Sequence, residues 1–209
     1  MNNFIKSGCD VSELSDAELL ALLIHPQSIK KAIELLEMFG NFRGILTAEM
    51  VELTAVLSEK NACRLKAGLE IALRLAKPNL SKRVKITSPK EVADLVRVEM
   101  SLLDHEQLWV VILNQRNEVL TIDKIYKGGI NTIYVRVGEL FNKAVKLKAA
   151  GMIVVHNHPS GDYSPSPEDI AVTKQLVEAG KLLNISVEDH LIIANNQFCS
   201  LRERGLGFH

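Results

Sequence analysis

The sequence has few cysteines and no long apolar run, and each shortage excludes a class of protein. The three cysteines, Cys9, Cys63 and Cys199, are odd in number and far apart. Neither a disulfide framework nor a C-x-x-C metal site is therefore expected, and a reducing cytoplasm is favoured. No apolar run approaches the roughly 18 residues of a membrane span, and the N-terminus lacks the apolar core of a signal peptide. We expect a cytoplasmic protein with no membrane partner.

The sequence also lacks an excess of either charge. Lys plus Arg and Asp plus Glu both total 25, so the formal net charge is zero. A protein that mainly binds a phosphate backbone usually carries a basic excess or a basic stripe. The clearest basic cluster, Lys82, Arg83 and Lys85, is typical of a solvated linker. The composition therefore does not call for nucleic-acid binding.

Residues 1–77 have the pattern of a small all-helical domain, in which glycine and β-branched residues are sparse. Ser15 and Glu18 have the spacing of a capping box at the start of the first helix. Pro26 ends that helix, and Gly40 ends the second. The expected helices cover residues 15–24, 28–39, 48–57 and 61–76.

A polar, proline-containing segment follows, and we place a linker at residues 78–87. Beyond it, the continuous apolar segments 108–113 and 152–156 are typical of strands buried on both faces. Such strands alternate with helical patterns, which predicts a layered α/β domain over residues 88–209. The expected helices cover residues 88–100, 139–150 and 167–183, and the expected strands cover 108–113, 119–126, 132–135, 152–156, 190–194 and 198–201.

Candidate metal ligands are concentrated between His156 and Asp169. His156 and His158 are two residues apart at the end of a predicted strand, so their side chains share one face. Pro159 and Gly161 then turn the chain, and Asp169 lies in the first turn of the next predicted helix. Two imidazoles and one carboxylate match the ligand set of catalytic zinc, with a fourth position left to water.

Each of these residues also has a structural interpretation. Ser166 and Pro167 form a good helix start, in which Asp169 suits the helix dipole. An H-x-H pair can also lie on the surface without binding a metal. The combination at the end of a buried strand, before a Pro/Gly turn, favours the metal site. The tripeptide His-Asn-His does not indicate the nuclease class of that name, whose three residues are dispersed along the chain.

A resemblance to a known family rests on this segment. His156-x-His158, then seven residues, then Ser166-x-x-Asp169 resembles the signature of the JAMM (MPN-plus) metallopeptidases. The string HNHPSGDYSPSPEDI is similar to the bacterial RadC family within that group. Further similar segments, at 14–20, 189–193 and 201–205, extend the resemblance over nearly the whole chain.

The resemblance implies a fold and an activity. The fold would be a mixed sheet flanked by helices, in three layers like those of cytidine deaminases. A small all-helical, helix-hairpin-helix-like module would precede it. The activity would be zinc-dependent hydrolysis of a peptide or isopeptide bond, with a protein or peptide as the substrate.

The resemblance also implies a role for each matching residue. His156, His158 and Asp169 would bind Zn²⁺, and Ser166 would hydrogen-bond the zinc-bound water or the oxyanion of the substrate. Glu106 would be the general acid/base. Physical reasoning supports such a carboxylate, because zinc lowers the pKa of its water from about 15.7 to about 7 and a base must then accept the proton.

The sequence leaves the position of this carboxylate open. Glu106 precedes the predicted strand 108–113, and it meets the histidines only if their strands are antiparallel or suitably staggered. Glu139 is the rival, although its place at a helix start has a capping explanation. His105 would face the opposite way on a strand. His190 is either an outer partner of the metal site or a hydrogen-bonded structural histidine.

Three other function classes compare less well with the sequence. A DNA-associated accessory protein is the second hypothesis, because the family carries a DNA-repair label. The candidate hairpin at residues 56–62, however, has an added acid and no glycine, and the helices would otherwise serve to dock a protein. A zinc nucleobase deaminase requires H-x-E and P-C-x-x-C, which the chain lacks. A non-catalytic scaffold is disfavoured, because every ligand position is filled.

Overall fold

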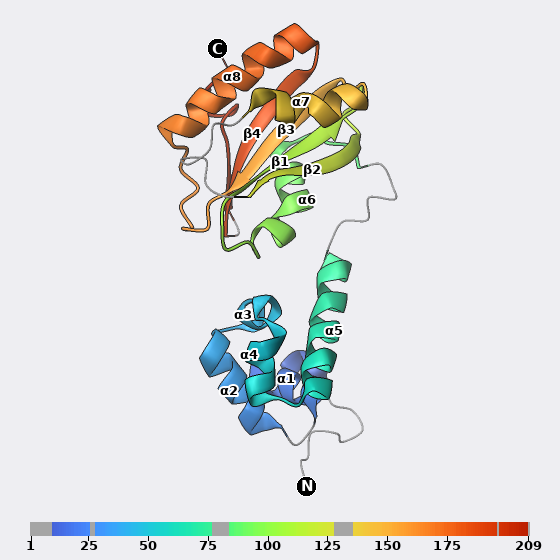
Figure 1. Cartoon of the computed structure of the whole chain (residues 1–209), viewed down its shortest axis with the longest axis vertical. Coiled ribbons are helices and arrows are strands. Elements are labelled where there is room, and N and C mark those ends of the chain that lie inside the picture. The colour runs from blue at the N-terminus through green and yellow to red at the C-terminus, as the bar shows by residue number, and fades with distance from the viewer. Residues whose placement is uncertain (1–9, 26–27, 77–83, 128–135, 196, 209) are drawn as a thin grey trace. The chain divides into compact units, whose positions relative to one another are not determined.

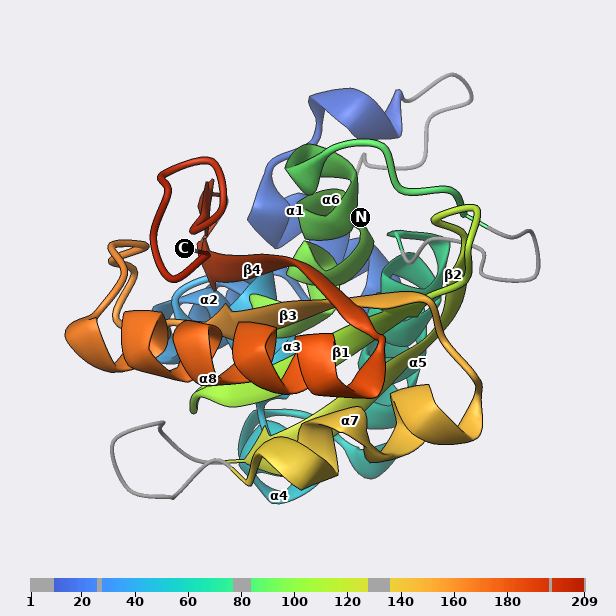
Figure 2. The same cartoon turned by 90° about the horizontal axis from the view of Figure 1, so that it is seen from above.

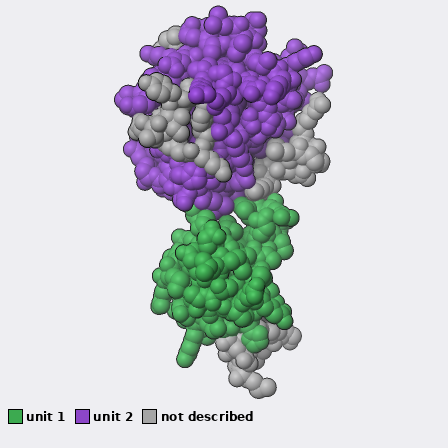
Figure 3. Space-filling view, in the orientation of Figure 1, with its two compact units in different colours: residues 1–76 green, residues 77–209 purple. Residues whose placement is uncertain are grey.

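The structure is a computed structural model that describes residues 10–25, 28–76, 84–127, 136–195 and 197–208 (Figure 1). The chain divides into two compact units, residues 1–76 and residues 77–209 (Figure 3). Within the described ranges, no helix is long and apolar enough to cross a membrane.

The first unit consists of helices around one apolar core. The core is made by buried side chains that include Leu20, Leu35 and Leu65. As expected, Ser15 and Glu18 form a capping box at the start of the first α-helix. The elements are a 3-10 helix, η1 (Val11–Glu13), and the α-helices α1 (Asp16–Ile24), α2 (Ile29–Phe39), α3 (Phe42–Thr47), α4 (Met50–Val56) and α5 (Glu59–Ala76).

One helix of this unit was not expected from the sequence. The helix predicted over 48–57 corresponds to α4, and α3, at Phe42–Thr47, is an additional α-helix before it. Asn41 caps α3 by accepting a hydrogen bond from the Gly44 amide at 3.0 Å. A side chain at Gly44 would have its Cβ only 2.0 Å from the Phe39 carbonyl oxygen. Glycine disfavours a helix in an isolated segment, yet here it allows α3 to pack against the end of α2.

The second unit contains a five-stranded mixed sheet in the order β2-β1-β3-β4-β5. β1 pairs antiparallel with β2 and β3, β3 pairs parallel with β4, and β4 pairs antiparallel with β5. The predicted strand 132–135 lies outside the described residues. The strands are β1 (Gln107–Leu113), β2 (Val119–Lys127), β3 (Gly151–Asn157), β4 (Ser186–Ala194) and β5 (Gln197–Ser200), and the helices are α6 (Pro89–Met100), α7 (Val137–Lys146) and α8 (Pro167–Leu183).

The sheet is the middle of three layers. Helix α6 covers one face, and α7 and α8 cover the other (Figures 1 and 2). Side chains of β1 alternate between the two cores: Trp109 and Val111 pack on the α6 side, and Leu108 and Val110 on the side of α7 and α8. β1 and β3 are buried along their whole length, because both faces of the sheet are covered. The expected fold class, a mixed sheet flanked by helices after a helical region, is confirmed.

The second unit also includes residues 84–87, which were predicted to belong to the linker at 78–87. The carbonyl of Val84 accepts a hydrogen bond from Val119 at 2.8 Å, and Lys85 forms a β-bridge with Glu118. Ile86 is buried in the core on the α6 side. The alternation of apolar Val84 and Ile86 around Lys85 was the signal of this short extended segment.

Candidate metal centre

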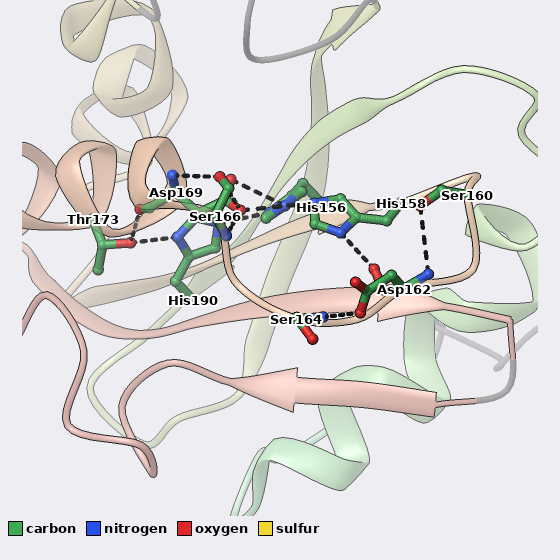
Figure 4. A network of polar contacts seen from close by, with 9 residues as sticks. All are labelled: His156, His158, Ser160, Asp162, Ser164, Ser166, Asp169, Thr173 and His190. Carbon is green, nitrogen blue, oxygen red and sulfur yellow. Dashed lines mark hydrogen bonds and ion pairs between the residues drawn. The ribbon is translucent and has the colours of Figure 1, made fainter.

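Three side chains converge at one end of the sheet. His156 lies near the end of β3, His158 is the first residue after β3, and Asp169 is in the first turn of α8 (Figure 4). One ligand atom from each lies within 4.8 Å of the other two. His156 Nε2 is 2.9 Å from His158 Nε2 and 3.3 Å from Asp169 Oδ1, and His158 Nε2 is 3.7 Å from Asp169 Oδ2.

The loop between β3 and α8 produces this convergence. β3 and β4 are parallel, so the chain must cross over between them, and α8 makes that crossover. The amide of His158 donates to the Ile193 carbonyl at 2.8 Å, which holds the loop against the end of β4. Gly161 has a φ of +91°, and a Cβ there would lie 2.8 Å from Asn195 Nδ2. The tight turn brings the start of α8 back to the end of β3.

The hydrogen bonds of His158 determine where its proton lies. Its Nδ1 is 2.7 Å from the backbone carbonyl oxygen of Asp162. A carbonyl only accepts, so Nδ1 carries the hydrogen and the Nε2 of the neutral ring has a lone pair. This lone pair is directed towards His156 and Asp169.

A chain of buried groups fixes the proton of His156 in the same way (Figure 4). The Thr173 hydroxyl donates its hydrogen to the Asp169 carbonyl at 2.6 Å, so it accepts from His190 Nδ1, also at 2.6 Å. His190 Nε2 then has a lone pair and accepts from His156 Nδ1 at 2.9 Å. His156 Nε2 is therefore left with a lone pair, as a metal ligand requires.

His190 is thus bonded directly to a candidate ligand, as an outer partner of the site would be. It is fully buried, with no exposed side-chain surface. Burial, together with the charges of His156 and His158, lowers the pKa of His190 to about 3, although Asp169 acts in the opposite direction. The neutral ring is the form that the hydrogen-bond chain needs.

Asp169 has its two carboxylate oxygens in different roles. Oδ2 accepts from the Ser166 amide at 2.8 Å and from the Ser166 hydroxyl at 2.7 Å, which completes a capping box at the start of α8. Oδ1 faces His156. Burial by itself raises the pKa of Asp169. It is outweighed by His156, when a proton rather than a metal lies between the two groups, and by the hydrogen bonds from Ser166, which together hold the pKa below its ordinary value. The carboxylate is therefore an anion at neutral pH.

The three groups fit a metal cation. Two lone pairs and an anionic oxygen point at one another, so a proton or a cation has to lie among them. Ligand atoms about 2.0–2.1 Å from one tetrahedral zinc would be about 3.3 Å apart. The two separations from His156 Nε2, 2.9 Å to His158 Nε2 and 3.3 Å to Asp169 Oδ1, are close to that value.

Glu106 comes directly before β1. β1 and β3 are antiparallel, and Leu108 is paired with His156. Glu106 is two residues before Leu108, and side chains two apart on an extended segment share a face. Continued for two residues beyond the last pair, this register would put Glu106 opposite His158, on the face of the sheet to which His156 points. The strands have the antiparallel arrangement that the sequence left open.

The rival carboxylate, Glu139, lies in the first turn of α7. It is exposed, and its Oε1 is 3.6 Å from Arg136 Nη1 one turn earlier. This pairing agrees with the structural interpretation of a helix-start acid. Two other buried polar residues, Thr173 and Asn157, were not singled out in the sequence. Thr173 had a signal, because it lies four residues after Asp169 and so on the same face of α8.

Comparison with known proteins gives matches over both units. The model of the RadC-like JAB domain matches residues 86–206. A UPF0758 protein of Roseiflexus castenholzii is 47% identical over 202 residues, which cover 93% of this chain and 87% of that protein. A UPF0758 protein of Chloroflexus aggregans is 47% identical over 203 residues, 93% of this chain and 88% of the relative. A UPF0758 protein of Bacillus pumilus is 38% identical over 209 residues, 97% of this chain and 92% of the relative.

Proposed function

The chain belongs to the RadC family, and from this membership we propose that it is a zinc-dependent hydrolase that cleaves peptide or isopeptide bonds. One observation carries the proposal. His156 Nε2, His158 Nε2 and Asp169 Oδ1 converge as acceptors, and each histidine uses its other nitrogen as a donor. That is the state in which histidine binds a metal.

The proposed roles combine the geometry of the cluster with the roles that the family resemblance implies. His156, His158 and Asp169 hold the ion. When bound, zinc would lower the pKa of a water molecule to about 7 and polarise the carbonyl of the scissile bond. Glu106 takes a proton from the attacking water and passes it to the leaving amine, as a carboxylate general acid/base does. The Ser166 hydroxyl donates to Asp169 Oδ2 in the metal-free chain. In the reaction this hydrogen would turn to the developing oxyanion, while Asp169 Oδ2 keeps the hydrogen bond from the Ser166 amide.

Metal analysis tests the first part of the proposal. The purified chain, supplied with zinc, is expected to hold one equivalent that a chelator removes. His156→Ala is expected to lose it, because two protein ligands bind zinc far more weakly than three. His25→Ala, a change in the helical unit, is the control and should keep the full equivalent. A wild-type chain without zinc under these conditions would refute the proposal.

Hydrolysis tests the second part. The probes are a quenched fluorescent peptide library and a matching set of Nε-linked lysine isopeptides. Glu106→Gln is expected to keep its zinc and to lower kcat about 10²- to 10⁴-fold, the range of general acid–base catalysis. Glu139→Gln is the control and should keep both. The assignment of the base is wrong if only the Glu139 variant loses activity.

A further inference from the structure

One side chain binds the backbone on both sides of Glu106. Asn157 Oδ1 accepts from the Gln107 amide at 2.7 Å, and Asn157 Nδ2 donates to the His105 carbonyl at 3.1 Å. Asn157 is only 3% exposed. The bond to the Gln107 amide is buried and so shielded from competing water, and the bond to the His105 carbonyl is partly buried.

These bonds occur where the main-chain ladder between β1 and β3 stops. The pairing ends at Leu108 and His156, so residues 105–107 no longer have β3 carbonyls and amides as regular partners. The Asn157 amide group replaces them, because it carries both an acceptor and a donor. Without it, the Gln107 amide would lose a hydrogen bond in a buried environment, and the His105 carbonyl would lose one in a partly buried environment.

Asn157 lies between the two candidate ligands in the sequence but belongs to the opposite face of the sheet. Along β3, His156 shares its face with Val154, which packs in the core beside α7 and α8. Asn157 follows the alternation of Val155, which packs in the core beside α6. From that face its side chain contacts the segment that carries Glu106 rather than the metal cluster.

The Gln107 side chain adds a second set of contacts on the same segment. Its Oε1 accepts from Trp109 Nε1 at 3.0 Å, and its Nε2 is 2.9 Å from His105 Nε2. Trp109 is 1% exposed. The segment is thus bound to the rigid core of the sheet, which suits a position that must be held precisely.

We propose that Asn157 is a positioning residue that holds Glu106 at the metal cluster. The inference rests on the proposed function, because it assigns Glu106 the role of general acid/base. β3 and the residue after it then supply the two candidate histidine ligands and the support of the base, so the distance between histidines and base is set within one hydrogen-bonded unit. Asparagine suits this position because aspartate lacks the donor and would repel the His105 carbonyl.

The first experiment measures the support without any activity. Amide hydrogen exchange of Gln107 is followed by NMR in the full-length, metal-free chain. Asn157→Ala is expected to speed exchange of that amide, while amides in the middle of β1, such as Val111, keep their protection. Asn114→Ala is the matched control, since Asn114 Oδ1 accepts from the Arg116 and Glu118 amides at the other end of β1. Unchanged exchange at Gln107 in the Asn157 variant would overturn the proposal.

The second experiment is a double-mutant cycle on the zinc-loaded chain with the same peptide and isopeptide probes. Asn157→Ala is expected to keep its zinc and its KM and to lower kcat about 10- to 100-fold, as for a misplaced catalytic group. When Asn157→Ala is added to Glu106→Gln, kcat should fall almost no further, because Asn157 affects catalysis only by positioning Glu106. Asn114→Ala should leave kcat unchanged in both backgrounds.

The outcomes separate this proposal from the proposed function. If zinc binds but the wild-type chain cleaves no probe, the proposed function fails, and the exchange measurement still decides whether Asn157 holds the segment. If kcat falls equally with and without Glu106, Asn157 acts by another route and the proposal is overturned. Lost zinc in Asn157→Ala would overturn it as well, because the residue would then support the ligands instead.

Discussion

Thr173→Val removes one buried hydroxyl that contacts no candidate ligand side chain, yet it should weaken zinc binding. Valine has nearly the shape of threonine, so the packing of the fully buried site changes little. The change leaves His190 Nδ1 without its acceptor. His190 can avoid this loss only by moving its hydrogen to Nε2, which faces His156 Nδ1. His156 must then carry its own hydrogen on Nε2, the atom that would bind the metal.

The magnitude follows from that choice. To bind zinc, the variant must restore the original tautomers and leave the His190 Nδ1 hydrogen unpaired in a buried position. An unsatisfied buried donor costs about 1–3 kcal/mol, which corresponds to a roughly 5- to 150-fold weaker affinity. Outer-shell partners of metal-bound histidines typically contribute a factor of about 10–100. The two estimates agree.

The assay is a competitive titration with a zinc-chelating dye at neutral pH. Thr173→Ser keeps the hydroxyl and should bind zinc like the wild type. Leu176→Ala, one turn further along α8 and also buried, should cost about 2–5 kcal/mol of stability with little change in zinc affinity. If Thr173→Val binds zinc as tightly as Thr173→Ser, the deduced proton chain from Thr173 to His156 is wrong.

Three further predictions concern the fold and the helical unit. Folding lowers the pKa of His190 from 6.5 to about 3. Between pH 6.5 and 3 this histidine is therefore protonated in the unfolded chain but not in the folded chain. The free energy of unfolding consequently falls as the pH drops through this range. In urea titrations of the metal-free chain, the free energy of unfolding should fall by about 2 kcal/mol between pH 7 and 5 because of His190. The His190→Gln variant should lack this contribution. An equal fall in both chains would contradict the lowered pKa. Ser166→Ala and Ser88→Ala each remove a helix cap, and each should lower the free energy of unfolding by about 1 kcal/mol in the same titrations. Only Ser166→Ala should also lower kcat on the peptide and isopeptide probes. Equal effects of the two variants on kcat would rule out the oxyanion role of Ser166. The full-length chain should show no duplex-DNA binding at low salt, because its α4–α5 connection lacks glycine; an affinity that falls steeply with added salt would support the DNA-associated alternative.

The sequence could predict the parts of the site that depend on local geometry. His156 and His158 converge because they are two apart at a strand end, and Asp169 points back because it is in the first turn of the next helix. The expected place of Glu106 depends on the pairing between β1 and β3, in which Leu108 and His156 are 48 positions apart, and no local pattern determines that register. Asn157 was equally unpredictable, since its role exists only once β1 lies beside β3.

A comparison of α6 and α8 shows that the surroundings of a helix start determine whether its capping acid can be a metal ligand. Both begin with Ser-Pro-x-acid, and both form a capping box. Glu91 is on the surface, where its carboxylate accepts from the Thr87 and Ser88 amides at 2.6 and 3.2 Å. Asp169 forms the corresponding bonds with Oδ2 alone and is 1% exposed, so Oδ1 is left facing His156. Asp169 is shorter than Glu91, and the start of α8 lies beside the end of β3. The topology of the sheet therefore places the two imidazoles near the Asp169 carboxylate, which makes an ordinary helix-capping acid a candidate metal ligand.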